Sequence, residues 1–215
     1  MRRKERVERH GFSRIEYRQF KPSTSLRVAL AIAGVLTWPL VLPLAVLSRL
    51  SDDIFMTCSQ FLSFFPYVVG TVVRYEFYRF TLTRCGKNVM IGFGTVFVYR
   101  DIEIGDNVLI GMYNTVHHCD FGSYVLTAEG CRFLSGPHYH DFDRVDVPMA
   151  LQGGRLRRIR IADDVWIGTN AVIMNDIGTG SVVGAGSVVV DAVAPGDVVV
   201  GVPARQVRNR LTDSK

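Results

Sequence analysis

The sequence predicts a parallel β-helix built from six-residue repeats, and three observations support this fold class. Ile161, Ile167 and Ile173 recur at every sixth position. The same spacing returns in residues 104–110 and again in residues 183–189. A period of six fits neither an amphipathic helix nor a simple alternating strand, and is typical of hexapeptide repeats. Each repeat supplies one short strand whose first residue points inward, and small residues allow the tight corner that follows.

The composition is that of one globular domain with a substantial core. The chain has 215 residues, of which 48% are hydrophobic, and this is enough for a single domain. The four cysteines, at positions 58, 85, 119 and 131, show no Cys-x-x-Cys spacing. We therefore expect reduced thiols in a cytosolic protein rather than a disulfide framework.

The N-terminal part is basic and is followed by an apolar segment. Residues 1–27 hold nine Arg or Lys and three Glu, and residues 28–47 carry no charge. As a helix, residues 28–47 would reach about 30 Å, the thickness of a bilayer core. A basic block beside an apolar segment favours contact with anionic lipid head groups. Nucleic-acid binding is not expected, because no nucleic-acid motif accompanies the charge.

We expect residues 28–84 to be helical and membrane-associated, and several arrangements are open. Residues 28–47 and the less apolar residues 54–73 could form a hairpin that crosses a membrane and returns. The favoured alternative is a re-entrant or shallow helix pair broken at Pro39 and Pro43, since each proline removes a backbone donor. A third reading is two helices packed on the β-helix. Residues 74–84 suit a helix at the head-group level or one that caps the β-helix.

The repeats begin near Asn88 and are interrupted once. The predicted inward positions are Ile91, Phe97, Ile104, Ile110, Val116, Phe121, Thr127, Phe133, Ile161, Ile167, Ile173, Val183 and Val189. Residues 136–158 contain little of the pattern and predict a projecting loop, because a long insertion in a regular coil is usually functional or disordered. The polar residues 205–215 are expected to form a C-terminal tail, as a short helix or without regular structure.

Three ordered blocks resemble the hexapeptide-repeat acyltransferases, most of all the galactoside, maltose and polysaccharide O-acetyltransferases. The blocks are Asp-Asp-Val-Trp-Ile-Gly (163–168), Val-Gly-Ala-Gly-Ser-Val-Val (183–189) and Gly-Val-Pro-Ala-Arg (201–205). The resemblance covers roughly residues 85–208. It implies an all-β domain over residues 85–204 that is a left-handed parallel β-helix. It also implies a homotrimer whose active sites lie between neighbouring β-helices.

The resemblance further implies transfer of an acetyl group from acetyl-CoA to a sugar hydroxyl. A hydroxyl needs a base to withdraw its proton, and histidine suits this because its pKa lies near working pH. The family places its catalytic histidine just after a Gly at the coil-to-loop junction, which here favours His138, with His140 as the rival. The order differs, since the family often has His directly between Gly and Pro. Asn114 and Asp120 match acceptor-pocket positions, or are corner residues that bond backbone.

For the acetyl donor, the resemblance implies a groove between adjacent coils. The residues small enough to let a pantetheine arm approach are Gly168, Thr169, Gly184, Ala185 and Gly186. Trp166 matches the position beside that groove, and Arg205 and Arg208 match positions that meet the CoA phosphates. Asp191 departs from the family pattern, which usually has a lysine at this corner.

The sequence thus predicts an O-acetyltransferase that acts on a membrane-linked glycan or polysaccharide precursor at the cytoplasmic face of a bacterial inner membrane. N-acetylation of an amino sugar is the nearest alternative. Some left-handed β-helix proteins are zinc enzymes of the carbonic-anhydrase type, but the characteristic His-x-x-x-x-His spacing is absent, so no metal is expected. An inactive scaffold is the remaining alternative.

Overall fold

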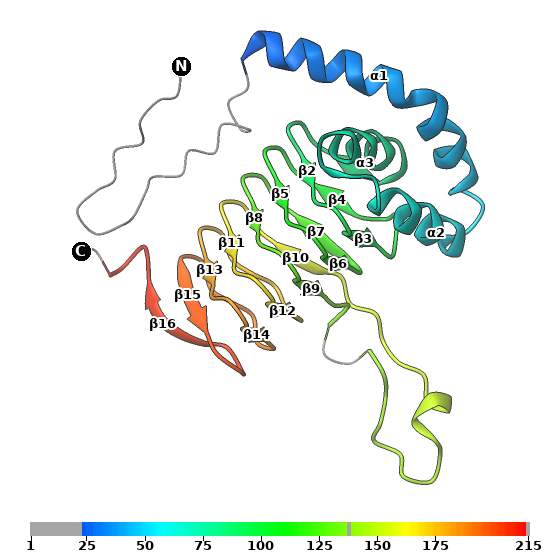
Figure 1. The fold of residues 1–215 in the computed structure, drawn as a ribbon. Helices are drawn as coiled ribbons and strands as arrows, with labels where there is room; N and C mark the ends of the chain where they lie inside the picture. Colours follow the sequence, from blue (N-terminus) through cyan, green and yellow to red (C-terminus); the bar gives the residue numbers. More distant parts are fainter. Residues whose placement is uncertain (1–22, 137–138, 214–215) are drawn as a thin grey trace.

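The computed structural model describes residues 23–136 and 139–213, and shows a parallel β-helix closed at one end by helices (Figure 1). The chain visits three flat sheets in turn, which we call sheets A, B and C. Sheet A contains β1 (Arg84–Cys85), β4 (Glu103–Ile104), β7 (Cys119–Phe121) and β10 (Ile159–Ile161). Sheet B contains β2 (Met90–Ile91), β5 (Leu109–Ile110), β8 (Leu126–Thr127), β11 (Trp166–Ile167), β13 (Val182–Val183), β15 (Asp197–Val200) and β16 (Arg205–Asn209). Sheet C contains β3 (Val96–Phe97), β6 (Thr115–Val116), β9 (Arg132–Phe133), β12 (Val172–Ile173) and β14 (Val188–Val189).

The predicted repeat is confirmed by the register of the strands. Successive coils pair in parallel, so that Ile110 lies beside Thr127 and Thr127 beside Ile167. All thirteen predicted inward residues are at most 3% exposed. The core is therefore a column of stacked aliphatic and aromatic side chains inside the coil, as the six-residue period requires.

The corner between sheets A and B shows why a hexad can turn so tightly. In six successive coils it holds one residue with a positive φ, namely Asn88, Asn107, Tyr124, Asp164, Gly180 and Gly196. Glycine and asparagine adopt this left-handed conformation at little cost. The four cysteines are free, as the sequence predicts.

Three helices precede the coils. They are α1 (Thr24–Leu47), α2 (Asp52–Ser63) and α3 (Tyr67–Thr81). Ser23 and Ser51 cap α1 and α2, because their hydroxyl oxygens accept hydrogen bonds from the nitrogens of Leu26 and Ile54. The buried Tyr78 of α3 contacts Phe97 with ring centroids 4.5 Å apart. The second half of α3 thus caps the open end of the β-helix, one of the two roles considered from the sequence, but the helix ends at Thr81 and Arg84 already belongs to β1.

Two expectations about this region are wrong. First, α1 runs without a break through Pro39 and Pro43, so it is one helix and not a re-entrant pair. Second, residues 54–73 are divided between α2 and α3 at Pro66, so they do not form the return arm of a hairpin. Within residues 23–136 and 139–213, α1 is the one helix long and apolar enough to cross a membrane, and only 17% of its most apolar window is buried.

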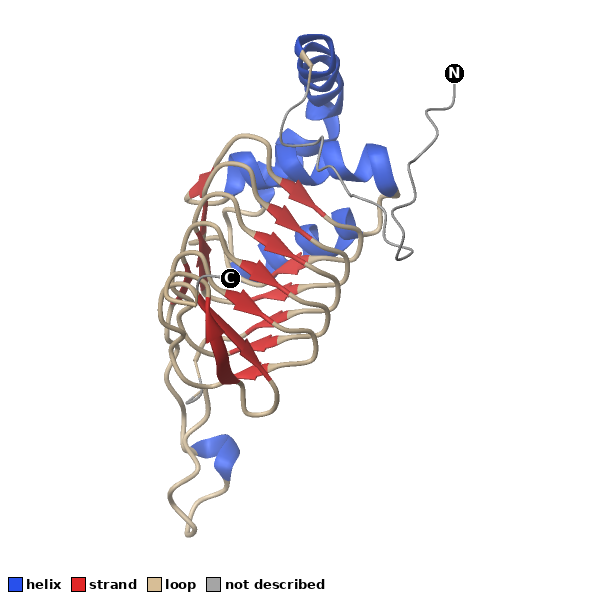
Figure 2. Cartoon of the chain, turned by 90° about the vertical axis from the view of Figure 1, so that its left-hand side faces the viewer, coloured by secondary structure: helices blue, strands red, loops and turns tan. Residues whose placement is uncertain are grey.

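The interruption at residues 136–158 projects from the coils as predicted (Figures 1 and 2). It leaves after β9, contains the short helix η2 (Met149–Leu151) and returns at β10. The C-terminal residues differ from expectation, since Arg205–Asn209 form strand β16 and pair antiparallel with β15. The pairing covers the exposed edge of β15, which explains why a polar segment is extended here.

Candidate active site

The projecting loop begins at the corner between sheets C and A, which we call the histidine corner. It comprises residues 98–101, 117–118, 134–140 and 157–158, of which 137 and 138 lie outside the described residues. Because Val96 pairs with Thr115 and Thr115 with Arg132, the coils bring Tyr99, His118 and Ser135 into one column. The backbone nitrogen of His118 donates to the Ser135 hydroxyl at 3.3 Å.

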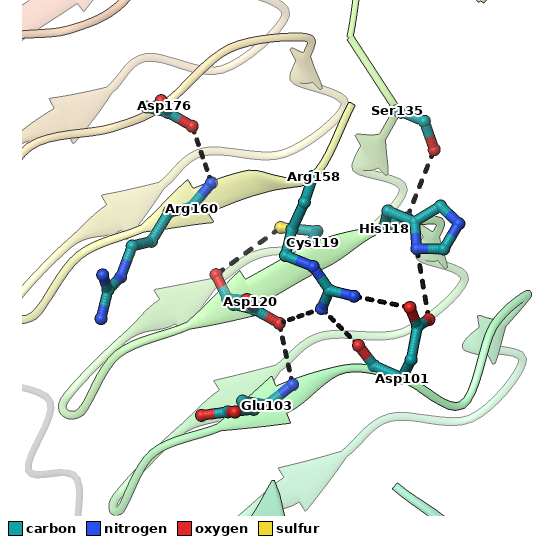
Figure 3. Close-up of polar contacts among 9 residues, drawn as sticks. All are labelled: Asp101, Glu103, His118, Cys119, Asp120, Ser135, Arg158, Arg160 and Asp176. Carbon is teal, nitrogen blue, oxygen red and sulfur yellow. Dashed lines mark hydrogen bonds and ion pairs between the residues drawn. The ribbon is translucent and has the colours of Figure 1, made fainter. Parts of the chain in front are cut away.

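His118 is held by a carboxylate, which Figure 3 shows, and by an aromatic ring. Its Nδ1 lies 3.2 Å from Asp101 Oδ1, and its side chain is 15% exposed. The Tyr99 ring stacks on the imidazole, with centroids 3.9 Å apart and an interplanar angle of 14°. A carboxylate at Nδ1 favours the tautomer that leaves a lone pair on Nε2. The second ring nitrogen points away from Asp101 in Figure 3, so this dyad can accept a proton or a hydrogen bond.

Arg158 ties the returning end of the loop to the earlier coils. Its guanidinium lies 2.5 Å from Asp101 Oδ2 and 3.0 Å from Asp120 Oδ1. Burial opposes the charged form, but Asp120 and Asp101 raise the pKa of Arg158 overall. The neighbouring Arg157 bonds in the other direction, to Asn175 at 2.6 Å and Asp176 at 2.5 Å. The two arginines therefore hold the base of the loop against coils on both sides.

Two further histidines and a second tyrosine complete the corner. The Tyr139 ring lies 6.1 Å from His117 and 4.7 Å from His140 between ring centroids. Burial, and then the neighbouring His118, lower the pKa of His117. His117 Nδ1 is buried and has no hydrogen-bond partner among the residues that the structure describes. Burial and a hydrogen bond with Tyr139 raise the pKa of Tyr99.

The structure separates the predicted acceptor residues. His140 is exposed at the start of the loop, and His138 lies outside the described residues. Asp120 faces outward on β7, where it accepts from Arg158 and from the Glu103 nitrogen at 2.9 Å. Asn114 is only 1% exposed and lies inside the coil.

The Asn114 amide bonds the coil itself. Its Nδ2 donates to Gly111 O, Thr127 Oγ1 and Ala128 O, and its Oδ1 accepts from the Cys131 nitrogen at 2.6 Å. This is the corner role considered from the sequence, and it leaves no amide hydrogen for an acceptor molecule.

The predicted donor residues gather at the opposite edge of sheet C, at the corner between sheets B and C. We call this the glycine corner, and it includes Gly168, Thr169, Gly184, Ala185 and Gly186. A Cβ on Gly168 would lie 2.5 Å from the Ala185 nitrogen, and one on Gly184 would lie 2.7 Å from Val200. Coil packing therefore already requires these two glycines. Gly186 has φ +68° and faces open space.

A groove of about 400 Å³ follows the same side of the molecule. Trp166, 54% exposed on β11, lines it together with Phe93, Leu109, Met112 and Leu126. The groove lies over the earlier coils, and its lining contains none of the residues named at the glycine corner. Its apolar wall suits a pantetheine arm. Further along the axis, Arg208 is exposed.

At the end of the coils, Asp191 forms an ion pair with Arg205, whose Nη1 lies 3.1 Å from Asp191 Oδ2. The acid that departs from the family pattern is thus paired with a predicted phosphate-binding residue.

One chain does not bring the two corners together. The glycine corner precedes the strands of sheet C and the histidine corner follows them, so the length of these strands separates the two corners. Within residues 23–136 and 139–213, no group of three or more His, Cys, Asp and Glu is placed to hold a metal ion.

Sequence reasoning missed Tyr99, Asp101, His118, Tyr139 and Arg158 as members of the site. The available signal was the coil register, because Tyr99 and His118 lie one coil apart, directly below the loop start. The Arg158 contacts carried no such signal, since they depend on how the loop returns.

The fold and its two corners define a left-handed parallel β-helix of the hexapeptide-repeat class, with a loop-bearing polar corner and a glycine-rich one. Comparison with known proteins agrees. A probable macrolide acetyltransferase of Lysinibacillus sphaericus is 30% identical over 125 residues, 47% of this chain and 69% of that protein. The chain therefore belongs to the hexapeptide-repeat acyltransferase family.

Other relatives give the same class. A probable acetyltransferase of Mycobacterium tuberculosis is 34% identical over 130 residues, 59% of this chain, and the chain spans only 37% of its length. The crystal structure of a hexapeptide-repeat-containing acetyltransferase of Vibrio cholerae has a TM-score of 0.60 and 27% identity, and covers 74% of this chain and 92% of its own. Its complex with acetyl-CoA has a TM-score of 0.52 and 29% identity, over 63% and 75% of the two chains. No family model matches the chain.

Proposed function

We propose that this protein transfers an acetyl group from acetyl-CoA to a sugar hydroxyl, with a histidine of the histidine corner as general base. The proposal rests on the composition of the histidine corner, where three described histidines and two tyrosines surround the base of the projecting loop. The family resemblance favours His138 as the base and His140 as the next candidate. His118, fixed by Asp101, offers its Nε2 to a neighbouring acceptor hydroxyl.

The proposed reaction balances with one base. The imidazole takes the hydroxyl proton while the oxygen attacks the thioester carbonyl carbon. The tetrahedral intermediate then breaks its carbon–sulfur bond, and the departing thiolate receives the proton from the imidazolium. The products are the acetyl ester and free CoA.

The donor is assigned to the glycine corner. A structural neighbour has been crystallised with acetyl-CoA, and the groove beside Trp166 has the apolar wall that a pantetheine arm needs. The exposed guanidinium groups of Arg205 and Arg208 would meet the phosphates.

The separation of the two corners by the strands of sheet C supports a homotrimer. A neighbouring copy that lays its glycine corner against the histidine corner would complete the site, whereas one chain alone would not. We propose this arrangement, with each active site shared between two copies.

The acceptor is proposed to be a glycan or polysaccharide precursor linked to the cytoplasmic face of a bacterial inner membrane. The exposed apolar α1 supports this choice. A macrolide is the second candidate acceptor, because one relative is a probable macrolide acetyltransferase. An amino sugar, acetylated on its nitrogen, is the third candidate acceptor.

The test measures CoA release and acetyl incorporation with a lipid-linked sugar panel, free amino sugars and a macrolide. We expect a lipid-linked sugar to be acetylated. His138→Gln should lower kcat by about 10²–10⁴-fold, with the melting temperature unchanged. His140→Gln and His118→Gln, made in parallel, should cost less. No CoA release with any acceptor would reject the function, and full activity in His138→Gln with loss in His140→Gln would reassign the base.

A further inference from the structure

The second half of α1 is fixed to the body of the protein. A Cβ on Gly34 would lie 2.6 Å from Glu76 Oε1, so α1 and α3 touch at this point. The Trp38 indole nitrogen donates to Glu76 Oε2 at 3.1 Å, and the Trp38 ring packs edge-on against Phe80 at 5.8 Å. Arg79 pairs with the same carboxylate at 2.7 Å. A buried carboxylate with two partners makes this a specific contact rather than a loose association.

The contact continues to the end of the helix. Val41 and Ala45 are 0% and 5% exposed, and Ser48 is fully buried. Beyond the helix, Arg100 of the first coil donates to the Arg49 carbonyl at 3.2 Å. The helix from Gly34 onward thus lies side-on against α3 and α2, and Glu76 and Arg79 place charged groups beside it.

Among residues 23–136 and 139–213, the first half of α1 has no such partner. Every residue from 24 to 32 is exposed (Figure 1). Leu26, Val28, Leu30 and Ile32 are 47%, 54%, 44% and 58% exposed, although they point in different directions around the helix. A helix that is apolar all round needs an apolar medium rather than one flat protein surface.

The length of this free segment limits what it can do. Arg27 carries a charge, so the uncharged part of the free segment is residues 28–32. At about 1.5 Å per residue these reach about 7 Å, roughly a quarter of a bilayer core of about 30 Å. A full crossing would have to draw the Glu76–Arg79 contact and the charged end of the β-helix into lipid, which is costly.

We propose that α1 inserts into a single leaflet of an anionic bilayer and does not cross it. The uncharged residues 28–32 enter the lipid, while Arg27 and the eight other Arg or Lys among residues 1–27 remain with the anionic head groups. The N-terminus and the histidine corner then stay on the same side of the membrane. This deepens the membrane part of the proposed function and rests on it.

The first test is vesicle co-sedimentation of the full chain with phosphatidylglycerol–phosphatidylcholine and with phosphatidylcholine alone. We expect tighter binding to the anionic vesicles and at least about a tenfold loss in Val28→Ser/Ile32→Ser, because two buried aliphatic side chains are removed. Val145→Ser is the matched control, since Val145 is fully exposed on the loop. Equal binding of the wild type and the double variant would overturn the proposal.

The second test concerns sidedness. In a Cys85→Ala background, Ser25→Cys and Lys87→Cys are labelled with an impermeant maleimide in spheroplasts and in inverted membrane vesicles. We expect both positions to label from the cytoplasmic side only. Labelling of the two positions from opposite sides would show a crossing helix and overturn the proposal. Acetyl transfer to a soluble sugar is measured separately in detergent, where no membrane is needed. Failure of the membrane proposal can therefore be distinguished from failure of the proposed enzymatic activity.

Discussion

Arg74 is the sharpest test of how the helices close the β-helix. Its side chain is completely buried, which lowers its pKa. Its Nε donates to the Ile91 carbonyl of β2 at 2.8 Å, and its Nη1 to the Phe65 carbonyl at 2.8 Å. Longer bonds reach Ser63 at 3.3 Å and Leu62 at 3.4 Å. One guanidinium thus satisfies the carbonyl end of α2 and joins it to the first coils.

Arg74→Met would remove these donors while keeping an apolar side chain of similar length. The two short charge-assisted bonds are worth about 1.5–3 kcal/mol each. Relief from burying an unpaired charge offsets part of that loss. We therefore expect a net destabilisation of about 3 kcal/mol, or a fall in melting temperature of about 6–12 °C for a chain of this size.

Differential scanning fluorimetry and urea denaturation measure this change. Arg74→Lys keeps the charge but provides one donor group in place of the planar fork, and should fall between the wild type and Arg74→Met. Arg84→Met, at an exposed position, is the control and should shift stability by less than about 0.5 kcal/mol. If Arg74→Met melts with the wild type, the guanidinium does not hold the cap and the reasoning is refuted.

Three other predictions concern the site. Asp191→Lys should lower the KM for acetyl-CoA, more at low salt than at high salt. Asp191→Asn should free Arg205 from its ion pair and lower the KM by less. An unchanged KM in both variants would show that this corner does not touch the donor. The pKa of His117 is lowered in the folded protein, so its contribution to stability is present above about pH 6.5 and is lost as the pH falls below that value. His117→Phe should therefore reduce the fall in melting temperature below about pH 6.5. An unaltered profile of melting temperature against pH would contradict this. Asn114→Ala should destabilise the coil by about 2–4 kcal/mol while leaving the acceptor KM unchanged, and the opposite result would return Asn114 to the acceptor pocket.

The fold was predictable because one period governs most of the chain. Counting in sixes, with one-residue slips at two corners, identified thirteen inward residues from Ile91 to Val189, although it missed the buried Ile177. The failure of the count at residues 136–158 marked the loop. Such a pattern depends only on local spacing and on which side chains a narrow coil can hold. The capping role of the aromatic and basic residues 74–84 was also open to sequence reasoning.

The remaining features depend on contacts between segments far apart in the sequence. Pro39 and Pro43 were expected to break α1, but packing along α3 keeps the helix continuous. Residues 205–209 form a strand because they pair with the edge of β15. Their polar sequence did not indicate this strand. The stacking of the coils forms the Asp101–His118 pair, and the return of the loop forms the Arg158 contacts to Asp101 and Asp120. No single sequence motif predicts either set of contacts.

The antiparallel direction of β16 has a consequence for assembly beyond the single molecule. A stack of parallel coils ends in an edge onto which another such stack could add, and repeated addition would give a filament. At the first coils α2 and α3 cover that edge, and at the last coil β16 runs the wrong way to template a parallel strand. Its exposed Arg205 and Arg208 add like charges that disfavour end-to-end contact. Strand β16 thus limits the number of coils, and we expect a chain shortened before residue 205 to polymerise along the coil axis, which the full chain should not do.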